Sequence, residues 1–170
     1  LLGTCAFDVG FHGPFLLGVA RELGADAVLL IDPSAGLLDS NLLDATIEHA
    51  DAHPETELDF APAPPGVCGP LLRMPLLDRL AVSGQHPGRL LHYSTDVISR
   101  EPLAGDACVP VPTPVARATH RLTLDSDRQI ARISAAVGPL DREFATASAE
   151  QLVRRQRDAS RPDALPREVV

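Results

Sequence analysis

Apolar and polar residues form successive blocks in the first third of the chain, and each block matches one type of secondary structure. Residues 13–26 (GPFLLGVARELGAD) repeat apolar side chains at helical spacing, and Gly24 stands where a helix is expected to end. Residues 27–31 (AVLLI) form a short continuous apolar run, which indicates a buried strand. A second helix is predicted over 39–53 (DSNLLDATIEHADAH) and a short strand over 57–62 (ELDFAP). This order of elements favours a parallel sheet covered by helices.

Each of these two helices is expected to bury one apolar face. In the second helix, Leu43, Ile47 and Ala50 should face inward, and Asp39 or Ser40 can cap the first turn. In the first helix, the expected apolar stripe consists of Leu16, Leu17, Val19, Ala20 and Leu23.

The middle of the chain has a looser pattern than its first third. A helix is predicted over residues 75–84 (PLLDRLAVSG), with Pro75 in its first turn, and a further helical turn over 87–94. Residues 107–125 are expected to be extended, because their prolines forbid a helix and alternate with β-branched residues. Residues 126–137 return to a helical pattern, which opens with a Ser-x-x-Gln capping box.

The end of the chain is polar and interrupted by prolines, which is typical of a linker. We therefore divide the sequence into an α/β domain, residues 1–137, and a segment of helix and polar linker, residues 138–170. The linker is expected to lead toward a possible downstream domain.

Composition limits the class of protein. The 170 residues are 45% hydrophobic and 22% charged, as in ordinary soluble globular domains. The net charge of -8 argues against a nucleic-acid-binding surface, which needs clustered positive charge, and no apolar run is long enough to cross a membrane. The three cysteines, Cys5, Cys68 and Cys108, are widely spaced and odd in number. They favour buried, unreactive thiols and a cytoplasmic location.

Two histidines, His49 and His53, stand four residues apart on the second predicted helix. This spacing occurs in zinc sites, but the glutamate of the H-E-x-x-H motif is missing, because Ala50 follows His49. No third ligand lies nearby in the sequence. The pattern therefore favours an exposed, solvated helix face over a metal site.

Two aspartates are placed where α/β folds bind ligands, beyond the carboxyl ends of strands. Asp32 follows the apolar strand 27–31, and Asp125 follows a predicted strand over 120–124. Two carboxylates at one sheet edge would suit a Mg²⁺ ion that also holds the phosphates of a nucleotide. The alternative is that each aspartate only caps the turn or helix that follows it.

The segments around these aspartates resemble motifs of one family. "VLLIDPSAGLLDSNLLDATI" is similar to the central motif of nucleotidyltransferases with the nucleotide-diphospho-sugar transferase (GT-A) fold. "RLTLDSDRQIARI" is similar to the late motif of cytidylyltransferases that act on sugar acids or spore-coat polysaccharide precursors. The resemblance implies a three-layer, Rossmann-like α/β fold. Such enzymes open with a glycine-rich loop that is not found before Asp32, so the fold is expected to be incomplete at its N-terminus.

The same resemblance implies an activity and a set of site residues. The activity is magnesium-dependent nucleotidyl transfer to a sugar or sugar-acid phosphate. Asp32 and Asp125 would be the metal ligands, with no catalytic residue beyond them, and Arg121 would contact a phosphate or the substrate. Gly66 lies in a Pro-Pro-Gly stretch that is most simply a tight turn, although a loop in this region of the family approaches the sugar.

A second resemblance points to a non-catalytic role. "PPGVCGPLLRMPLLDRL", "PGRLLHYSTD" and "THRLTLDSDRQIARI" are similar, in this order, to segments of the transferase-like domain at the N-terminus of spiro-SPASM-type radical SAM proteins. This resemblance implies an accessory or substrate-recognition domain that precedes a radical SAM domain. The cysteines that hold the iron–sulfur cluster in such proteins are not in this sequence, so no iron–sulfur cluster is expected in this chain.

Overall fold

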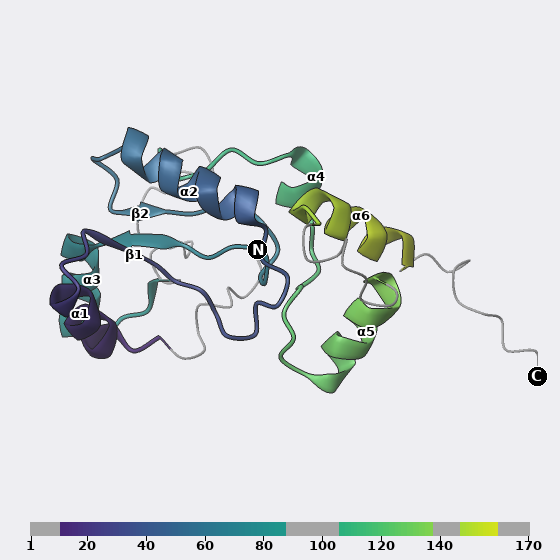
Figure 1. Ribbon diagram of the computed structural model, residues 1–170, viewed down its shortest axis with the longest axis horizontal. Helices are drawn as coiled ribbons and strands as arrows, with labels where there is room; N and C mark the ends of the chain where they lie inside the picture. The colour runs from purple at the N-terminus through teal and green to yellow at the C-terminus, as the bar shows by residue number, and fades with distance from the viewer. Residues whose placement is uncertain (1–10, 88–105, 138–146, 160–170) are drawn as a thin grey trace, which may run out of the picture.

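The computed structural model describes residues 11–87, 106–137 and 147–159 (Figure 1). Most of the helical turn predicted over 87–94, Cys5 and the end of the chain lie outside these residues. The helices are α1 (Gly13–Glu22), α2 (Ser40–Ala52), α3 (Met74–Ser83), α4 (Thr113–Ala116), α5 (Asp127–Val137) and α6 (Ala149–Ala159). The strands are β1 (Ala27–Leu29), β2 (Leu58–Asp59) and β3 (Leu71–Arg73).

The three strands form one small sheet in the order β1-β3-β2. Both outer strands pair antiparallel with β3, and Leu72 lies opposite Val28 on one side and Leu58 on the other. The predicted parallel sheet is therefore wrong, because β3 lies between the first two strands and runs in the opposite direction. Since β1 and β2 share one direction, their carboxyl ends still lie at the same edge of the sheet.

The strand β3 has only three residues and lies between Pro70 and the start of α3. Such a segment is too short to show an alternating pattern, and its proline neighbours argue against a strand. Beyond β2, Phe60 forms an isolated parallel bridge with Cys108, which places the start of the segment 107–125 beside this part of the sheet.

Helices cover both faces of the sheet (Figure 1). Because side chains alternate along a strand, Leu58 and Leu72 face α1 and α3, whereas Asp59 points to α2, where it contacts His49. We call the hydrophobic cluster that Leu58 and Leu72 form with α1 and α3 the α1–α3 core. Its buried residues are Leu17, Ala20, Leu58, Leu72, Leu76, Leu77 and Leu80.

A second hydrophobic cluster, which we call the α4–α6 core, lies where the last three helices meet α2 and the loop after β2. Its buried residues are Leu42, Val67, Val115, Leu122, Ile133, Ala149 and Leu152. Helix α6 contacts both α4 and α5, so the described part of 138–170 contributes side chains to this core. The domain division after residue 137 stays a prediction.

Helix α4 contradicts the fully extended conformation predicted for residues 107–125. Its first turn holds Pro114, where a missing backbone N–H costs nothing because first-turn N–H groups have no partner within the helix. Val115 follows and is buried in the α4–α6 core. Pro114, which the sequence pattern indicates as a helix breaker, therefore lies in the first turn of a helix.

The buried faces of α1 and α2 differ from the predicted ones. On α2 the buried positions are Leu42, Thr46 and Ala50, and Ile47 is 42% exposed. On α1, Leu17 and Ala20 are buried but Leu23 is 76% exposed. The expected apolar stripes were wider than the surfaces that the small sheet and α3 can cover. The capping prediction for α2 is confirmed for Asp39.

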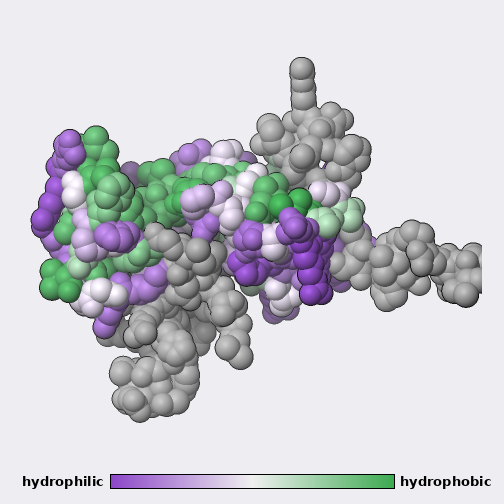
Figure 2. Space-filling model, turned by 90° about the horizontal axis from the view of Figure 1, so that it is seen from below, coloured by the Kyte–Doolittle hydropathy of each residue, from purple (hydrophilic) through white to green (hydrophobic). Residues whose placement is uncertain are grey.

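The two ends of the molecule differ in polarity (Figure 2). Exposed apolar side chains gather at the end formed by α1 and α3, where Phe15 and Val82 are 66% and 88% exposed. The opposite end, with α5 and α6, is largely hydrophilic. Within the described ranges, no helix combines the length and apolar character needed to cross a membrane.

Candidate functional site

Asp32 lies in the turn that follows β1, where the sequence places it. Its Oδ1 atom accepts hydrogen bonds from the backbone N–H of Ser34 at 2.7 Å and from the Ser34 hydroxyl. The N–H of Ala35 donates to the Asp32 carbonyl at 2.9 Å, which closes the turn. The side chain is half-buried, and within the described part of the chain its Oδ2 atom has no hydrogen-bonding partner. Asp32 therefore fixes a turn with one oxygen, while the other accepts no hydrogen bond from the described residues.

Asp125 does not follow a sheet strand, because the structure assigns no strand to residues 120–125. This segment is held by loops instead: Leu122 N–H donates to the Pro65 carbonyl and Leu124 N–H donates to the Ser34 carbonyl, both at 2.8 Å. The prediction of a strand over 120–124 is wrong, since two side-by-side loops supply the acceptors that a neighbouring strand would have supplied.

The Asp125 carboxylate is surrounded by donors from its own segment. Oδ2 accepts from the Arg121 guanidinium and from the Thr123 hydroxyl, the latter at 3.0 Å. Oδ1 has a long contact of 3.4 Å with the Ser126 hydroxyl. The Arg121 and Asp125 side chains are 44% and 28% exposed, so this ion pair faces solvent.

The four residues singled out from the sequence thus come from three loops that are hydrogen-bonded to one another. We call Asp32, Ser34, Gly66, Arg121 and Asp125 the strand-end site. The Leu124–Ser34 hydrogen bond joins the turn of Asp32 to the segment of Asp125. The Leu122–Pro65 hydrogen bond joins that same segment to the turn of Gly66. Their roles as ligands and substrate contacts stay predictions.

Gly66 has a structural reason to be glycine. Its φ is +107°, a backbone conformation that residues with a side chain rarely adopt. A Cβ atom at this position would lie 2.2 Å from the Leu122 carbonyl oxygen. The absence of a side chain is therefore what lets the Pro-Pro-Gly turn lie directly against the segment that carries Arg121 and Asp125.

The strand-end site has two carboxylates, which is the type and number of protein ligands that magnesium commonly takes. Magnesium prefers oxygen ligands and typically takes only one or two protein carboxylates, completing its shell with waters and substrate phosphates. Asp32 and Asp125 supply two such carboxylates from hydrogen-bonded loops. Among the described residues, no group of three or more histidine, cysteine, aspartate or glutamate side chains is placed to hold a metal ion.

Sequence reasoning missed a buried polar cluster on the α2 face of the sheet. Asp59 is fully buried and its carboxylate lies 3.0 Å from His49 Nδ1. The Thr56 hydroxyl lies 3.0 and 2.9 Å from the two Asp59 oxygens. His53 Nδ1 lies 3.2 Å from a Glu55 oxygen. The exposed helix face predicted for the histidines is wrong for His49, whose side chain is only 13% exposed.

A signal for this cluster was present in the pattern "ELDFAP". An aspartate between two apolar residues of a short strand points to the face opposite its neighbours, and α2 covers that face. The prediction that Ala50 faces inward is confirmed, but Leu42 and Thr46 are buried in place of the predicted Leu43 and Ile47. The buried face of α2 therefore lies closer to His49 than the predicted one.

Both described cysteines are free, and burial raises the pKa of each thiol above its usual value. The Cys68 sulfur also lies 3.5 Å from the Thr46 hydroxyl. A raised pKa lowers the fraction of reactive thiolate, which agrees with the unreactive thiols expected from the sequence.

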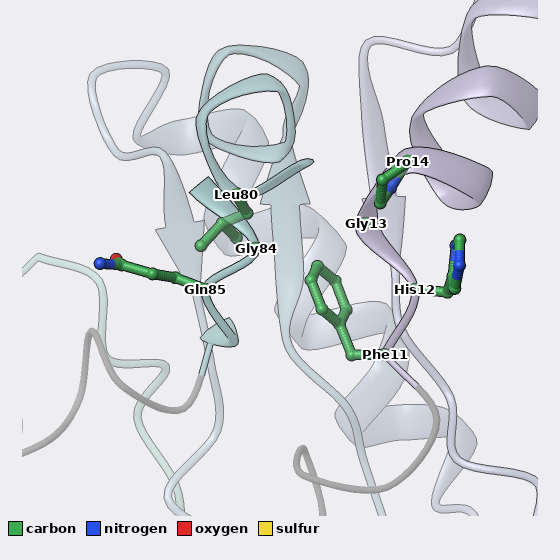
Figure 3. A pocket seen from close by; sticks show the side chains of 7 residues that line it. All are labelled: Phe11, His12, Gly13, Pro14, Leu80, Gly84 and Gln85. Carbon is green, nitrogen blue, oxygen red and sulfur yellow. The ribbon is translucent and has the colours of Figure 1, made fainter. Parts of the chain in front are cut away.

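A small hollow of about 110 Å³ lies between the start of α1 and the end of α3 (Figure 3). Phe11 and His12 line one side, and Leu80 and Gln85 line the other. Pockets for small-molecule ligands usually enclose about 300 to 1,000 Å³, so this hollow is too small for a nucleotide. None of its lining residues belongs to the strand-end site.

Comparison with protein-family models, with curated proteins and with solved structures gives no match for this chain.

Proposed function

We propose that the strand-end site binds magnesium together with nucleotide phosphates, and that the protein transfers a nucleotidyl group to a sugar or sugar-acid phosphate. The observation that carries this proposal is the hydrogen bond from Leu124 N–H to the Ser34 carbonyl. It joins two carboxylate-bearing segments that are nearly a hundred residues apart in sequence. The proposal includes the three-layer, Rossmann-like fold, of which helices on both faces of a sheet would be a part.

The residues of the site have separable tasks under this proposal. Asp32 and Asp125 would hold the metal, which when bound offsets negative charge on the phosphate being transferred. Ser34 fixes one Asp32 oxygen, so the other is presented without a change of the turn. Arg121 would exchange its bond with Asp125 for a substrate phosphate, which a guanidinium binds with two parallel hydrogen bonds.

Calorimetric titration of the full chain with CTP, with and without MgCl₂, tests this proposal. We expect binding that requires magnesium and that weakens at least about tenfold in Asp32→Asn and in Asp125→Asn, because hydrogen bonds or contacts to charged groups contribute about 1.5 to 3 kcal/mol. The matched control is Asp44→Asn, since Asp44 is an exposed aspartate of α2 outside the site. Equal affinity in all four proteins would rule out the metal role.

A second candidate function is that of a non-catalytic recognition domain beside a radical SAM domain. It is favoured by the local bonding of both carboxylates: Asp32 fixes its turn through Ser34, and Asp125 pairs with Arg121. Such bonding also fits aspartates that only shape their loops. Titration with magnesium and each of the four common nucleoside triphosphates separates the two candidates. Binding supports the transferase, and its absence for all four supports the recognition domain.

A further inference from the structure

His49 lies in the last turn of α2 and His53 is the residue that caps the end of this helix, and their rings lie side by side. Their centroids are 4.5 Å apart and their planes are inclined by 33°. Both rings therefore project from the same side of the last turns of the helix. The two side chains are 13% and 37% exposed, so one is held within the fold and the other reaches solvent.

Each ring is held by a carboxylate through the same nitrogen. His49 Nδ1 lies 3.0 Å from Asp59, and His53 Nδ1 lies 3.2 Å from Glu55. An ionised carboxylate only accepts hydrogen bonds, so Nδ1 must be the donor in both rings. A neutral histidine that donates from Nδ1 has its lone pair on Nε2. Within the described part of the chain, neither Nε2 atom has a hydrogen-bonding partner.

This arrangement is the one that metal-binding histidines use. A histidine that binds a metal through one nitrogen almost always donates its other N–H to a carboxylate, a carbonyl or a water, which fixes the tautomer and the ring orientation. Here two histidines at helical i, i+4 spacing each have such a carboxylate. The orientation of His49 is held further, because the Thr56 hydroxyl donates to the Asp59 carboxylate.

The local charge also favours a cation. Residues 48–59 contain five acidic residues and no arginine or lysine. Arg79 pairs with Glu57, and the Arg73 guanidinium donates to the carbonyls of Thr56 and Ala50. The five acidic residues of this segment therefore outnumber the two arginines that contact it.

We propose that Nε2 of His49 and Nε2 of His53 bind one divalent transition metal ion, of which Zn²⁺ is the type. Imidazole nitrogen is a preferred ligand of zinc, and two protein ligands leave coordination positions for water or for a donor from another molecule. Asp59 and Glu55 are positioning residues that hold the rings. This site uses nitrogen donors and is separate from the magnesium site proposed at the strand ends, whose donors are carboxylate oxygens.

Calorimetric titration of the full chain with ZnCl₂ tests this proposal. We expect saturable binding at one ion per chain, reduced at least about tenfold in His53→Gln and in His49→Gln. Glu55→Gln should weaken binding by about 10- to 100-fold, as is usual for a carboxylate behind a metal-binding histidine. The matched control is His120→Gln. His120 is a histidine outside the proposed site, and its Nδ1 atom lies 3.4 Å from the Arg132 guanidinium.

Since His53 and Glu55 are partly exposed, their variants should fold, which circular dichroism checks. Bound zinc should also raise the thermal midpoint of the unchanged protein and of His120→Gln, but not of His53→Gln. Unchanged zinc affinity in His53→Gln, or no saturable binding by the unchanged protein, would overturn the proposal. Neither result bears on the nucleotide titration, which measures a different ion at different residues.

Discussion

At the scale of single residues, the backbone at Gly66 leaves no room for a side chain. A side chain there would meet both a positive φ and the Leu122 carbonyl oxygen at 2.2 Å. We expect Gly66→Ala to lower the free energy of unfolding by about 1 to 3 kcal/mol or more, the usual cost of a strained backbone residue. Urea denaturation followed by far-UV circular dichroism measures this change.

The matched control is Gly18→Ala in the interior of α1, where a Cβ atom would meet nothing within 4 Å. This replacement should stabilise the protein by roughly 0.5 to 1 kcal/mol, because glycine is a poor helix former. If both variants change stability in the same direction and by the same amount, the close approach of Gly66 to the Leu122 carbonyl does not contribute to the free energy of unfolding.

The exposed ion pair between Glu57 and Arg79 makes one contribution to stability dependent on pH. Arg79 donates two hydrogen bonds to the Glu57 carboxylate, from Nη1 to Oε1 at 2.7 Å and from Nη2 to Oε2. These bonds lower the pKa of the Glu57 carboxyl below its usual 4.5. A carboxyl with a lowered pKa stabilises the fold above its unfolded-state value, and this contribution is lost as the pH falls through the folded-state value. The pair is exposed, so its contribution is small.

We therefore expect Arg79→Ala to lower the free energy of unfolding slightly at pH 7 and to have less effect at pH 3. Urea titrations of both proteins at pH 7, 5 and 3 measure the difference. In a Glu57→Gln background the titrating group is gone, and the pH dependence of the Arg79→Ala effect should disappear. A difference between the two proteins that grows toward low pH would contradict this assignment.

At the scale of elements, one carboxylate holds the first turns of two helices. Asp39 Oδ1 accepts from the backbone N–H of Asn41 and Leu42 at the start of α2, at 3.0 and 3.4 Å. Its other oxygen accepts from the N–H of Ala149, the first residue of α6, at 2.7 Å. Negative charge is favourable at both helix N-termini, so a single buried side chain fixes α6 against α2.

We expect Asp39→Ala to lower the free energy of unfolding by about 2 to 4 kcal/mol, because it removes a helix cap and leaves a buried N–H group without a partner. Asp39→Asn should cost less, since its one carbonyl oxygen can still serve one helix. Amide hydrogen exchange at Ala149 should accelerate in both. The control Asp44→Asn, on the exposed side of α2, should change stability by no more than about 0.5 kcal/mol. Equal costs at the two positions would refute the shared cap.

The elements that the sequence predicts well are those whose signals are local. Helices α1, α2, α3 and α5 lie where apolar spacing and capping residues place them, within a few residues of the predicted bounds. The strand β3 was missed because three residues beside a proline have no local signature, and its pairing with β1 depends on contacts more than 40 residues away. The same long-range dependence decided which face of α2 is buried.

At the scale of the whole molecule, α2 links the two hydrophobic cores. Leu77 is fully buried in the α1–α3 core, and Leu122 is 1% exposed in the α4–α6 core. Helix α2 contributes Leu42 to the second core and contacts the sheet that closes the first. We therefore expect the described parts of the chain to unfold together.

Leu77→Ala and Leu122→Ala should each lower the free energy of unfolding by about 2 to 5 kcal/mol and should shift one common transition. Hydrogen exchange with mass spectrometry checks this, because opening near α1 should accelerate in both variants. Val82→Ala, at an 88% exposed position, is the control that should leave the transition in place. Two separate transitions, each moved by only one of the variants, would show that the cores unfold independently.

The strand-end site could be predicted from the sequence only as a set of residues. Asp32 is visible because a polar residue ends an apolar run, and Asp125 because it precedes a capped helix. Their proximity depends on the Leu124–Ser34 hydrogen bond between two loops, for which the sequence has no signal. The His49–Asp59 contact was hidden for a related reason, since it joins a helix face to a strand face.

The shared cap at Asp39 also sets an order of events during synthesis. Every buried residue of the α1–α3 core lies between positions 17 and 80, so that core can assemble while the rest of the chain is still being made. Asp39 and Leu42 must wait for residues 149 and 152, which leave the ribosome several seconds later at ordinary rates of elongation. During this interval the first turn of α2 lacks its final neighbour, and the nascent chain exposes the apolar surface that α6 later covers. A ribosome-bound chain stopped shortly before position 149 would thus lack the helix that covers this surface.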